Sequence, residues 1–366
     1  MRPDASAAAL AFAPARLTMA RELAGWRRRD LAEAIDRTPA AVSGYELGQS
    51  RPSAETLSRC AQALDVPPSF FAAGRPQLHL DTAQAHFRSL RATTATQRQQ
   101  ALAHVELLWE LVEQLDQVVE FPALDVGLTM GVPHGDPVMT ARTVRGAWGV
   151  VDGPAAHLVR NLEARGVVTT RVPMPDNDTI DAFSSALSGR PVIALTYKGN
   201  PMRRRFSVAH ELGHLLLHPE PEPGSLRHER EANLFAAEFL MPANEIRDLL
   251  PIGAEVGALK DLADCYGVTT ATLAYRGGNL GVYGESTVRR VVDTLSRMGW
   301  RTGEPVGSGY PGEQPELLRL AIELAAADGL TLPSLAARLH IGLPRLRALV
   351  GLSDTRPTLR LIHGAG

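Results

Sequence analysis

Apolar residues recur at helical spacing along most of this chain, and apolar runs typical of strands are confined to its middle. Residues 14–73 read as several short amphipathic helices, with Ser or Thr before some helix starts and Pro in the first turn. A longer helical pattern covers about residues 78–119, and residues 154–165 predict a further helix. The runs 167–172 and 192–197 predict strands. We therefore expect a multi-domain, mainly α fold with one small mixed sheet.

The breaks between these patterns suggest where segments begin and end. Pro122 and the Gly- and Pro-rich residues 127–137 interrupt the long helical pattern, which we interpret as a packed connecting helix because its heptad-like repeat is too short for a coiled-coil seam. Residues 259–276 and 331–350 each repeat a helix, a turn and a second helix. We interpret them as helices that pack or bind a partner at least as readily as further DNA-binding segments. The expected segments are an N-terminal all-α bundle (1–75), a helical connector (76–125), an α+β domain (126–250), a helical extension (251–300) and a C-terminal helical region (301–366).

The most specific chemical motif lies within a helical pattern at residues 206–218. His210 and His214 are four residues apart, so both imidazoles lie on one helix face and can reach one Zn²⁺, while Glu211 lies beside them. Neighbouring leucines indicate a buried helix, which suits a rigid metal site. The alternative is an ordinary buried helix with two hydrogen-bonded histidines. We favour a zinc site.

Two protein ligands hold zinc poorly, so a third should follow in the helical pattern of residues 229–242. At about 100° per residue, Glu229 and Asn233 lie at one margin of its apolar arc, whereas Glu231 and Glu238 lie about half a turn away. We predict Glu229 as the third ligand and Asn233 as an orienting partner for a ligating histidine. Glu231 and Glu238 are expected to be solvated or to support the ligands. The apolar arc consists of Ala232, Phe235, Ala236, Phe239 and Leu240.

The open fourth position of such a site is typical of catalytic zinc. Zinc would lower the pKa of a water molecule toward ~7 and polarise a carbonyl, and Glu211 would pass the proton to the leaving amine. Amide hydrolysis is the predicted reaction. His218 is a competing ligand candidate, but a supporting or helix-end hydrogen bond is the favoured role because Pro219 ends the helix.

Together, residues 203–214 and 229–242 resemble the ImmA/IrrE family of metallo-endopeptidases, and residues 180–184 and 190–195 resemble the strand-rich start of these domains. The resemblance implies a zincin-like α+β domain and a bacterial regulator. It also implies that the motif residues act as the family's ligands and catalytic glutamate. They are His210, Glu211, His214 and Glu229.

Residues 14–73 resemble the helix-turn-helix domain of the XRE (phage Cro and repressor) family, which implies binding to a double-stranded DNA operator. The positions expected to face the major groove, Pro39, Ala40, Ser43 and Gly44, cannot make bidentate contacts with bases. We therefore expect thin direct readout, dominant phosphate contacts and an operator binder that is weakly specific or depends on a homodimer. The expected DNA-binding residues are Arg27, Arg28, Arg29, Arg37, Thr38, Ala40, Ser43 and Arg51.

Composition restricts the class of protein and the compartment that we expect. The 366 residues contain 45% hydrophobic residues and no apolar run long enough to span a bilayer, so we expect a soluble protein without a membrane partner or signal peptide. Cys60 and Cys265 show no disulfide or metal-binding spacing, which favours a reducing cytoplasm. Lys198 and Lys260 are the only lysines, which indicates a GC-rich genome rather than a function.

Two functional hypotheses follow. In the first, a regulatory metalloprotease is brought to DNA and cuts a protein, such as a repressor or another transcription regulator. In the second, the zinc fold of a transcription factor senses a ligand or peptide without turnover. The presence of Glu211 favours the first hypothesis, because a sensor has no need of a general base.

Overall fold

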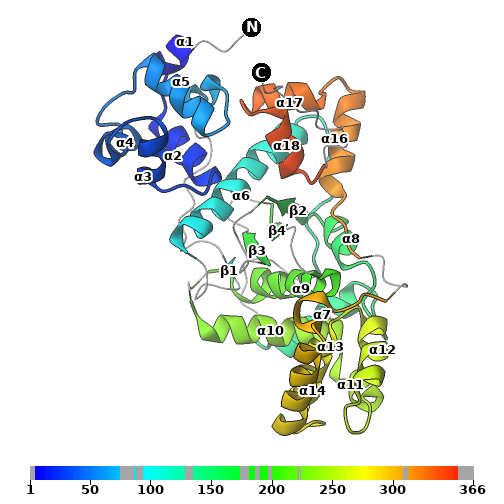
Figure 1. Ribbon diagram of the computed structural model, residues 1–366. Coiled ribbons are helices and arrows are strands. Elements are labelled where there is room, and N and C mark those ends of the chain that lie inside the picture. Colours follow the sequence, from blue (N-terminus) through cyan, green and yellow to red (C-terminus); the bar gives the residue numbers. More distant parts are fainter. Residues whose placement is uncertain are drawn as a thin grey trace, which may run out of the picture.

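Helices make up most of the computed structural model, and one four-stranded sheet lies near its centre (Figure 1). This confirms the mainly α fold with a small mixed sheet. The structure describes residues 5–74, 86–87, 94–127, 135–173, 181–185, 190–196, 200–220, 222, 224–307 and 312–352, with backbone alone at residues 86–87 and 302.

The N-terminal residues form a bundle of short helices. The Thr38 side chain accepts a hydrogen bond from the Ala41 amide at the start of α4, and Ser53 caps α5 through the Thr56 amide. The bundle is built from α1 (Ala5–Leu10), α2 (Pro14–Leu23), α3 (Arg28–Ala34), α4 (Pro39–Glu46), α5 (Ala54–Ala63) and the 3₁₀ helix η1 (Pro68–Ala72).

The long helix α6 (Ala95–Asp116) joins this bundle to the rest of the molecule (Figure 1). Arg16 of α2 and Glu110 of α6 form a buried ion pair at 2.9 Å, and the Gln100 side chain donates to the Leu23 carbonyl at 3.2 Å. Most residues of α6 are buried, so it is a core helix rather than an exposed coiled-coil seam.

The expected helix over residues 78–119 is wrong at its start. His86 and Phe87 form a short strand, β1, and the described helix begins at Ala95, after Thr94 has capped it. The strand exists because β1 pairs with a distant strand, a contact that helical periodicity cannot report. The other parts of residues 78–93 lie outside the described residues.

The sheet has the strand order β1-β3-β4-β2. β4 pairs in parallel with β2 and antiparallel with β3, and β1 pairs antiparallel with the outer edge of β3. The expected strands at 167–172 and 192–197 are confirmed over their described residues. The bounds are β1 (His86–Phe87), β2 (Val168–Val172), β3 (Ala182–Ser185) and β4 (Val192–Thr196).

Two hydrophobic cores lie on opposite faces of this sheet. Val192 and Ala194 of β4 face the core shared with the N-terminal bundle, α6 and the C-terminal helices, whereas Ile193 and Leu195 face the core around the histidine-bearing helix. Alternate side chains of a strand point to opposite faces. The sheet therefore lies between the two halves of the molecule and contributes side chains to the core of each.

Below the sheet in Figure 1 lie the helices of the second core. The helix predicted over residues 154–165 is shorter than expected, because His157 has a left-handed backbone (φ 52°) and α8 begins after it. The bounds are α7 (Pro137–Ala147), α8 (Leu158–Glu163), α9 (Pro201–Leu217), α10 (Leu226–Leu240), α11 (Ala243–Leu249), α12 (Val256–Tyr266), α13 (Thr270–Asn279), α14 (Glu285–Arg297) and α15 (Trp300–Gly303).

The C-terminal helices return to the N-terminal bundle. Thr170 of β2 donates to the Leu349 carbonyl at 2.9 Å, and the Arg345 side chain donates to the Leu64 carbonyl at 2.9 Å. No single helix in the described residues is long and apolar enough to cross a membrane, although α16 and α17, bent by 100°, together reach that length and composition. The bounds are α16 (Leu317–Ala327), α17 (Leu332–Arg338) and α18 (Leu343–Leu349).

Candidate metal centre

Helix α9 carries three of the predicted site residues. The Asn200 side chain accepts from the Met202 amide and caps the helix, and α9 ends at Leu217, before Pro219. His210 and Glu211 are fully buried, and His214 is 1% exposed. The helix thus holds these side chains inside the protein, packed between the sheet and α10.

The ligand atoms of two helices converge at this point. Nε2 of His210 and Nε2 of His214 are 3.0 Å apart, and carboxylate oxygens of Glu229 on α10 lie 3.5 Å from the first and 3.4 Å from the second. Tetrahedral ligands at the usual zinc distances lie about 3.3 Å from one another. Two imidazole nitrogens and one carboxylate oxygen at these separations fit a zinc ion.

The other ring nitrogen of His210 determines which nitrogen is available to a metal. Its Nδ1 lies 3.1 Å from the Oδ1 atom of Asn233, which can only accept a hydrogen bond. His210 Nδ1 therefore carries the hydrogen, and the lone pair lies on Nε2, facing His214 and Glu229.

A chain of hydrogen bonds sets the same tautomer for His214. The Nε2 atom of His218 lies 2.8 Å from Glu231, so it donates, and His218 Nδ1 lies 3.0 Å from Nδ1 of His214. Burial lowers the pKa of His218 to about 4 against the opposing effect of Glu231, which keeps its ring neutral near pH 7. His214 Nδ1 then donates, which leaves its Nε2 lone pair for a metal. Glu231 thus supports a ligand through His218, which is one of the two roles that the sequence predicts for it.

Glu211 contacts the sheet. The Ser184 hydroxyl of β3 donates to Glu211 Oε2 at 2.6 Å, and both residues are fully buried. The hydrogen bond holds the carboxylate in place beside His210. Ser184 was missed as a site residue; a serine within an apolar strand run was its only signal.

The carboxylate of Glu229 is ionised in this arrangement. Burial raises its pKa, but hydrogen bonds from His210 and His214, in the forms that carry a proton on Nε2, outweigh this effect and lower the pKa to about 2; a bound metal ion would take the place of those protons. An anionic carboxylate and two neutral imidazoles are the forms that bind a metal ion.

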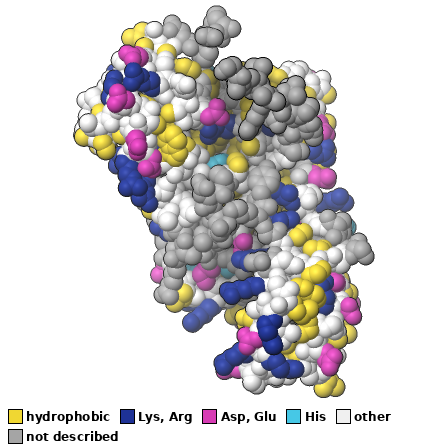
Figure 2. Space-filling view, viewed as in Figure 1, with side chains coloured by type: hydrophobic (Ala, Val, Ile, Leu, Met, Phe, Trp, Pro, Cys, Tyr) yellow, Lys and Arg dark blue, Asp and Glu magenta, His cyan; other side chains and the backbone are white. Residues whose placement is uncertain are grey.

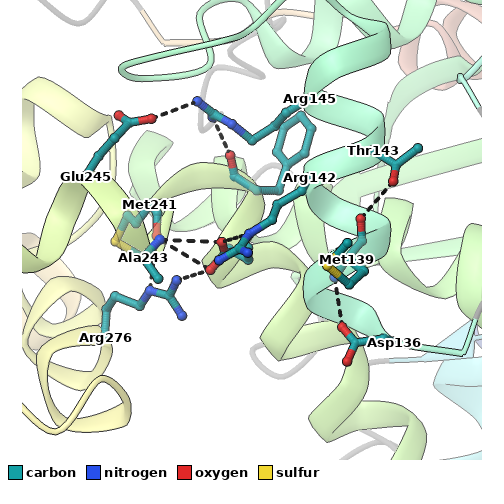
Figure 3. A network of polar contacts seen from close by, with 11 residues as sticks. Asp136, Met139, Arg142, Thr143, Arg145, Met241, Ala243, Glu245 and Arg276 are labelled. Atoms are coloured by element: carbon teal, nitrogen blue, oxygen red, sulfur yellow. Dashed lines mark hydrogen bonds and ion pairs between the residues drawn. The ribbon is translucent and has the colours of Figure 1, made fainter.

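Glu238 lies in a separate network. It is 1% exposed, so the expectation that it is solvated or supports the ligands is wrong. Arg142 of α7 and Arg276 of α13 form ion pairs with its carboxylate, and the Ala243 amide donates to it as well. Figure 3 shows Arg142, Arg276 and Ala243 close together in this network. Glu238 therefore joins three helices behind the metal centre, because its helical phase turns it away from α9.

A hollow of about 690 Å³ opens beside the centre. Asn233, which contacts His210, lies on its wall together with Phe206, Leu234, Tyr275 and Arg276. Leu234 and Tyr275 are exposed at 38% and 54%, and Arg276 is buried. Asn233 thus connects the centre to a partly apolar surface formed by α9, α10 and α13.

The residues predicted to bind DNA are spread over α3, α4 and the following turn. Arg27, Arg28, Arg29, Arg37, Thr38, Ala40 and Arg51 are exposed, and basic side chains gather over this side of the bundle near α3 (Figure 2). Arg28 also pairs with the buried Glu46 at 2.7 Å. Ser43 is only half-buried, but Gly44 is buried, and a Cβ there would lie 2.9 Å from Ser50 Oγ. The expectation that Gly44 faces DNA is wrong because it packs on the turn after α4.

The two-histidine, one-glutamate centre on helices packed against a mixed sheet is typical of a metallopeptidase-type domain. The bundle of short helices docked on α6 is typical of a helix-turn-helix domain. Residues 162–277 match the IrrE N-terminal-like domain, a peptidase family, and residues 17–71 match a helix-turn-helix family. The two domains follow one another in the order expected from the sequence. Comparison with curated proteins found no match.

Proposed function

We propose that this chain is a DNA-binding regulator whose IrrE N-terminal-like domain hydrolyses a peptide bond in a regulatory protein, such as a repressor. The observation that carries the proposal is the convergence of His210, His214 and Glu229 within 4.8 Å of one another, with the buried Glu211 following His210 on the same helix. A purely structural core has no need to bring these three ligand groups together.

His210, His214 and Glu229 would hold the metal ion. Two imidazoles and one carboxylate favour Zn²⁺, although other divalent ions accept the same ligands. When bound, zinc lowers the pKa of water and polarises a carbonyl group. Asn233 and the His218–Glu231 pair would keep the two imidazoles in the tautomer that presents Nε2.

Glu211 would move the proton. As an ionised carboxylate it takes the proton of the attacking water and delivers it to the nitrogen of the leaving amine. The Ser184 hydroxyl holds Glu211 at Oε2 during this transfer, since both side chains are fully buried. Burial also excludes bulk water, which would compete for the same proton.

The helix-turn-helix domain would bring this activity to DNA. Arg27, Arg29 and Arg37 are exposed near the ends of α3 and the start of α4, which suits contacts to phosphates. The buried Arg16–Glu110 pair joins the bundle to α6. The exposed arginines and the metal centre would therefore act within one packed protein. A protein substrate that is itself bound to DNA is therefore the favoured target.

The experiment that tests the proposal compares Glu211→Gln with the unchanged protein. Loss of the general base is expected to lower hydrolysis of a helix-turn-helix repressor, offered as the substrate, by about 10²–10⁴-fold. Zinc content, measured by elemental analysis, and binding to an operator duplex are expected to stay unchanged. Glu220→Gln, at an exposed glutamate just beyond the same helix, is the matched control.

Equal hydrolysis by both proteins, or hydrolysis that survives a chelator, would contradict the proposal. The sensor hypothesis makes the opposite prediction for regulation. If Glu211→Gln retains normal control of the promoter, turnover is not the regulatory event and the domain acts as a sensor.

A further inference from the structure

The outer edge of β3 lies beside the candidate reaction centre. Ser184 is on this strand, and its hydroxyl is 2.6 Å from Glu211 Oε2. Neighbouring strands of a sheet lie about 4.8 Å apart. A main chain that pairs with β3 at Ser184 therefore runs within one strand spacing of the residue that contacts the catalytic glutamate.

In this structure the chain itself occupies that edge. β1 pairs antiparallel with β3, with His86 opposite Ser184 and Phe87 opposite Phe183. The inner edge of β3 is paired with β4, and β2 at the far side of the sheet contacts α18 through Thr170. The edge next to Glu211 is thus the one covered by residues of the connector.

Extended peptides commonly bind to proteins by adding a strand to a sheet edge, where main-chain hydrogen bonds hold them without regard to sequence. An extended peptide paired with β3 would lie next to Ser184, which contacts Glu211. β1 uses the same edge, the same backbone groups of β3 and an antiparallel direction. A substrate and β1 cannot both pair with β3.

We propose, resting on the proposed peptidase function, that residues 86–87 are an internal competitor that occupies the peptide-binding edge of β3, so that the substrate must displace them. The segment that carries β1, residues 75–93, is joined to fixed elements at both ends. It leaves the bundle after Gly74 and enters α6 at Thr94, and the bundle and α6 are joined by Arg16–Glu110. Tethering at both ends gives β1 a high effective concentration at the edge, although only two residues pair.

The test replaces both residues of β1 by proline, His86→Pro with Phe87→Pro, because proline has no amide to donate to β3. The matched control is His86→Ala with Phe87→Ala, which keeps both amides. If proline prevents folding, glycine at both positions weakens the strand without removing its amides.

Two readouts are measured on the full-length protein. Amide hydrogen exchange of β3 is expected to become faster in the proline variant and to stay unchanged in the alanine control. Binding of fluorescein-labelled β-casein, an extended protein probe, is measured by anisotropy in a Glu211→Gln background. The apparent Kd is expected to fall about tenfold if the edge is free about a tenth of the time.

The outcomes separate this inference from the proposed function. Equal exchange or equal binding by the proline and alanine variants, including no binding by either, overturns the inference. Faster exchange and tighter binding support it even if the variant with Glu211 restored fails to hydrolyse casein; that failure counts against the peptidase function alone.

Discussion

At the scale of single residues, the centre depends on which nitrogen each histidine presents. His210 and His214 can both present Nε2 only because Asn233, His218 and Glu231 hold the opposite side of their rings. These partners touch no ligand position themselves. Their effect should therefore be seen in the affinity for zinc rather than in the fold.

Asn233→Ala removes the acceptor that fixes His210. Zinc affinity is expected to fall about 10–100-fold, because the imidazole can then rotate or change tautomer. Competition with a chromophoric chelator measures the loss. Asn279→Ala, an exposed asparagine in the same hollow, is the control and should bind zinc normally. Unchanged affinity in Asn233→Ala would show that the contact does not orient the ring.

At the scale of elements, the centre depends on how closely α9 packs on α10. Gly213, between the two ligating histidines, allows this approach, since a Cβ there would lie 3.0–3.2 Å from atoms of Phe235. Any side chain at this position must displace Phe235, which is fully buried. Glu229 comes from α10, so the same packing sets the distance between the ligands.

Gly213→Ala is expected to destabilise the protein by about 1–3 kcal/mol, because the added methyl group overpacks a tight helix contact. Gly257→Ala in α12 is the control. No atom lies within 4 Å of the Cβ it would add, so this change should be neutral or stabilising. Denaturant unfolding of both variants measures the difference. Equal stability would mean that Phe235 and α10 move to make room for the added methyl group without a cost in free energy.

At the scale of the whole molecule, α6 and the sheet connect the DNA-binding bundle with the metallopeptidase-type domain. One face of the sheet belongs to the core of the bundle and the other to the core of α9. His104 lies in the middle of this connection, 5% exposed, with its Nδ1 2.8 Å from the Gln100 carbonyl. A change at His104 should affect both halves.

Burial lowers the pKa of His104 from 6.5 to about 4, despite its hydrogen bond to Gln100. Between pH 4 and pH 6.5 the imidazole of His104 is protonated in the unfolded chain and neutral in the folded protein, so protonation favours unfolding. The stabilisation that the neutral His104 gives is therefore complete above pH 6.5 and is lost as the pH falls toward 4. We expect the free energy of unfolding to fall by up to about 3 kcal/mol over this range of pH. Unfolding of the unchanged protein and His104→Leu at pH 7 and pH 4.5 measures it. Parallel losses in both proteins would contradict the assignment.

Much of the metal centre was determined by local sequence. Helical phase placed His210 and His214 on one face and selected Glu229 among the carboxylates of its helix, because residues of one helix keep a constant angular spacing. Apolar spacing, together with caps and turn residues, likewise predicted many of the helices, and apolar runs predicted the strands β2 and β4. The two domain types followed from the same local patterns.

Only the tertiary structure decided the contacts between segments far apart in the chain. It brought Ser184 to Glu211, turned Glu238 toward Arg142 and Arg276, and made a strand of His86 and Phe87 within an expected helix. Pairing at a sheet edge depends on which edge a distant strand exposes, and hydrophobic spacing carries no information about that. The sequence by itself thus determined which side chains could share one helix face, and the fold determined what lies next to them.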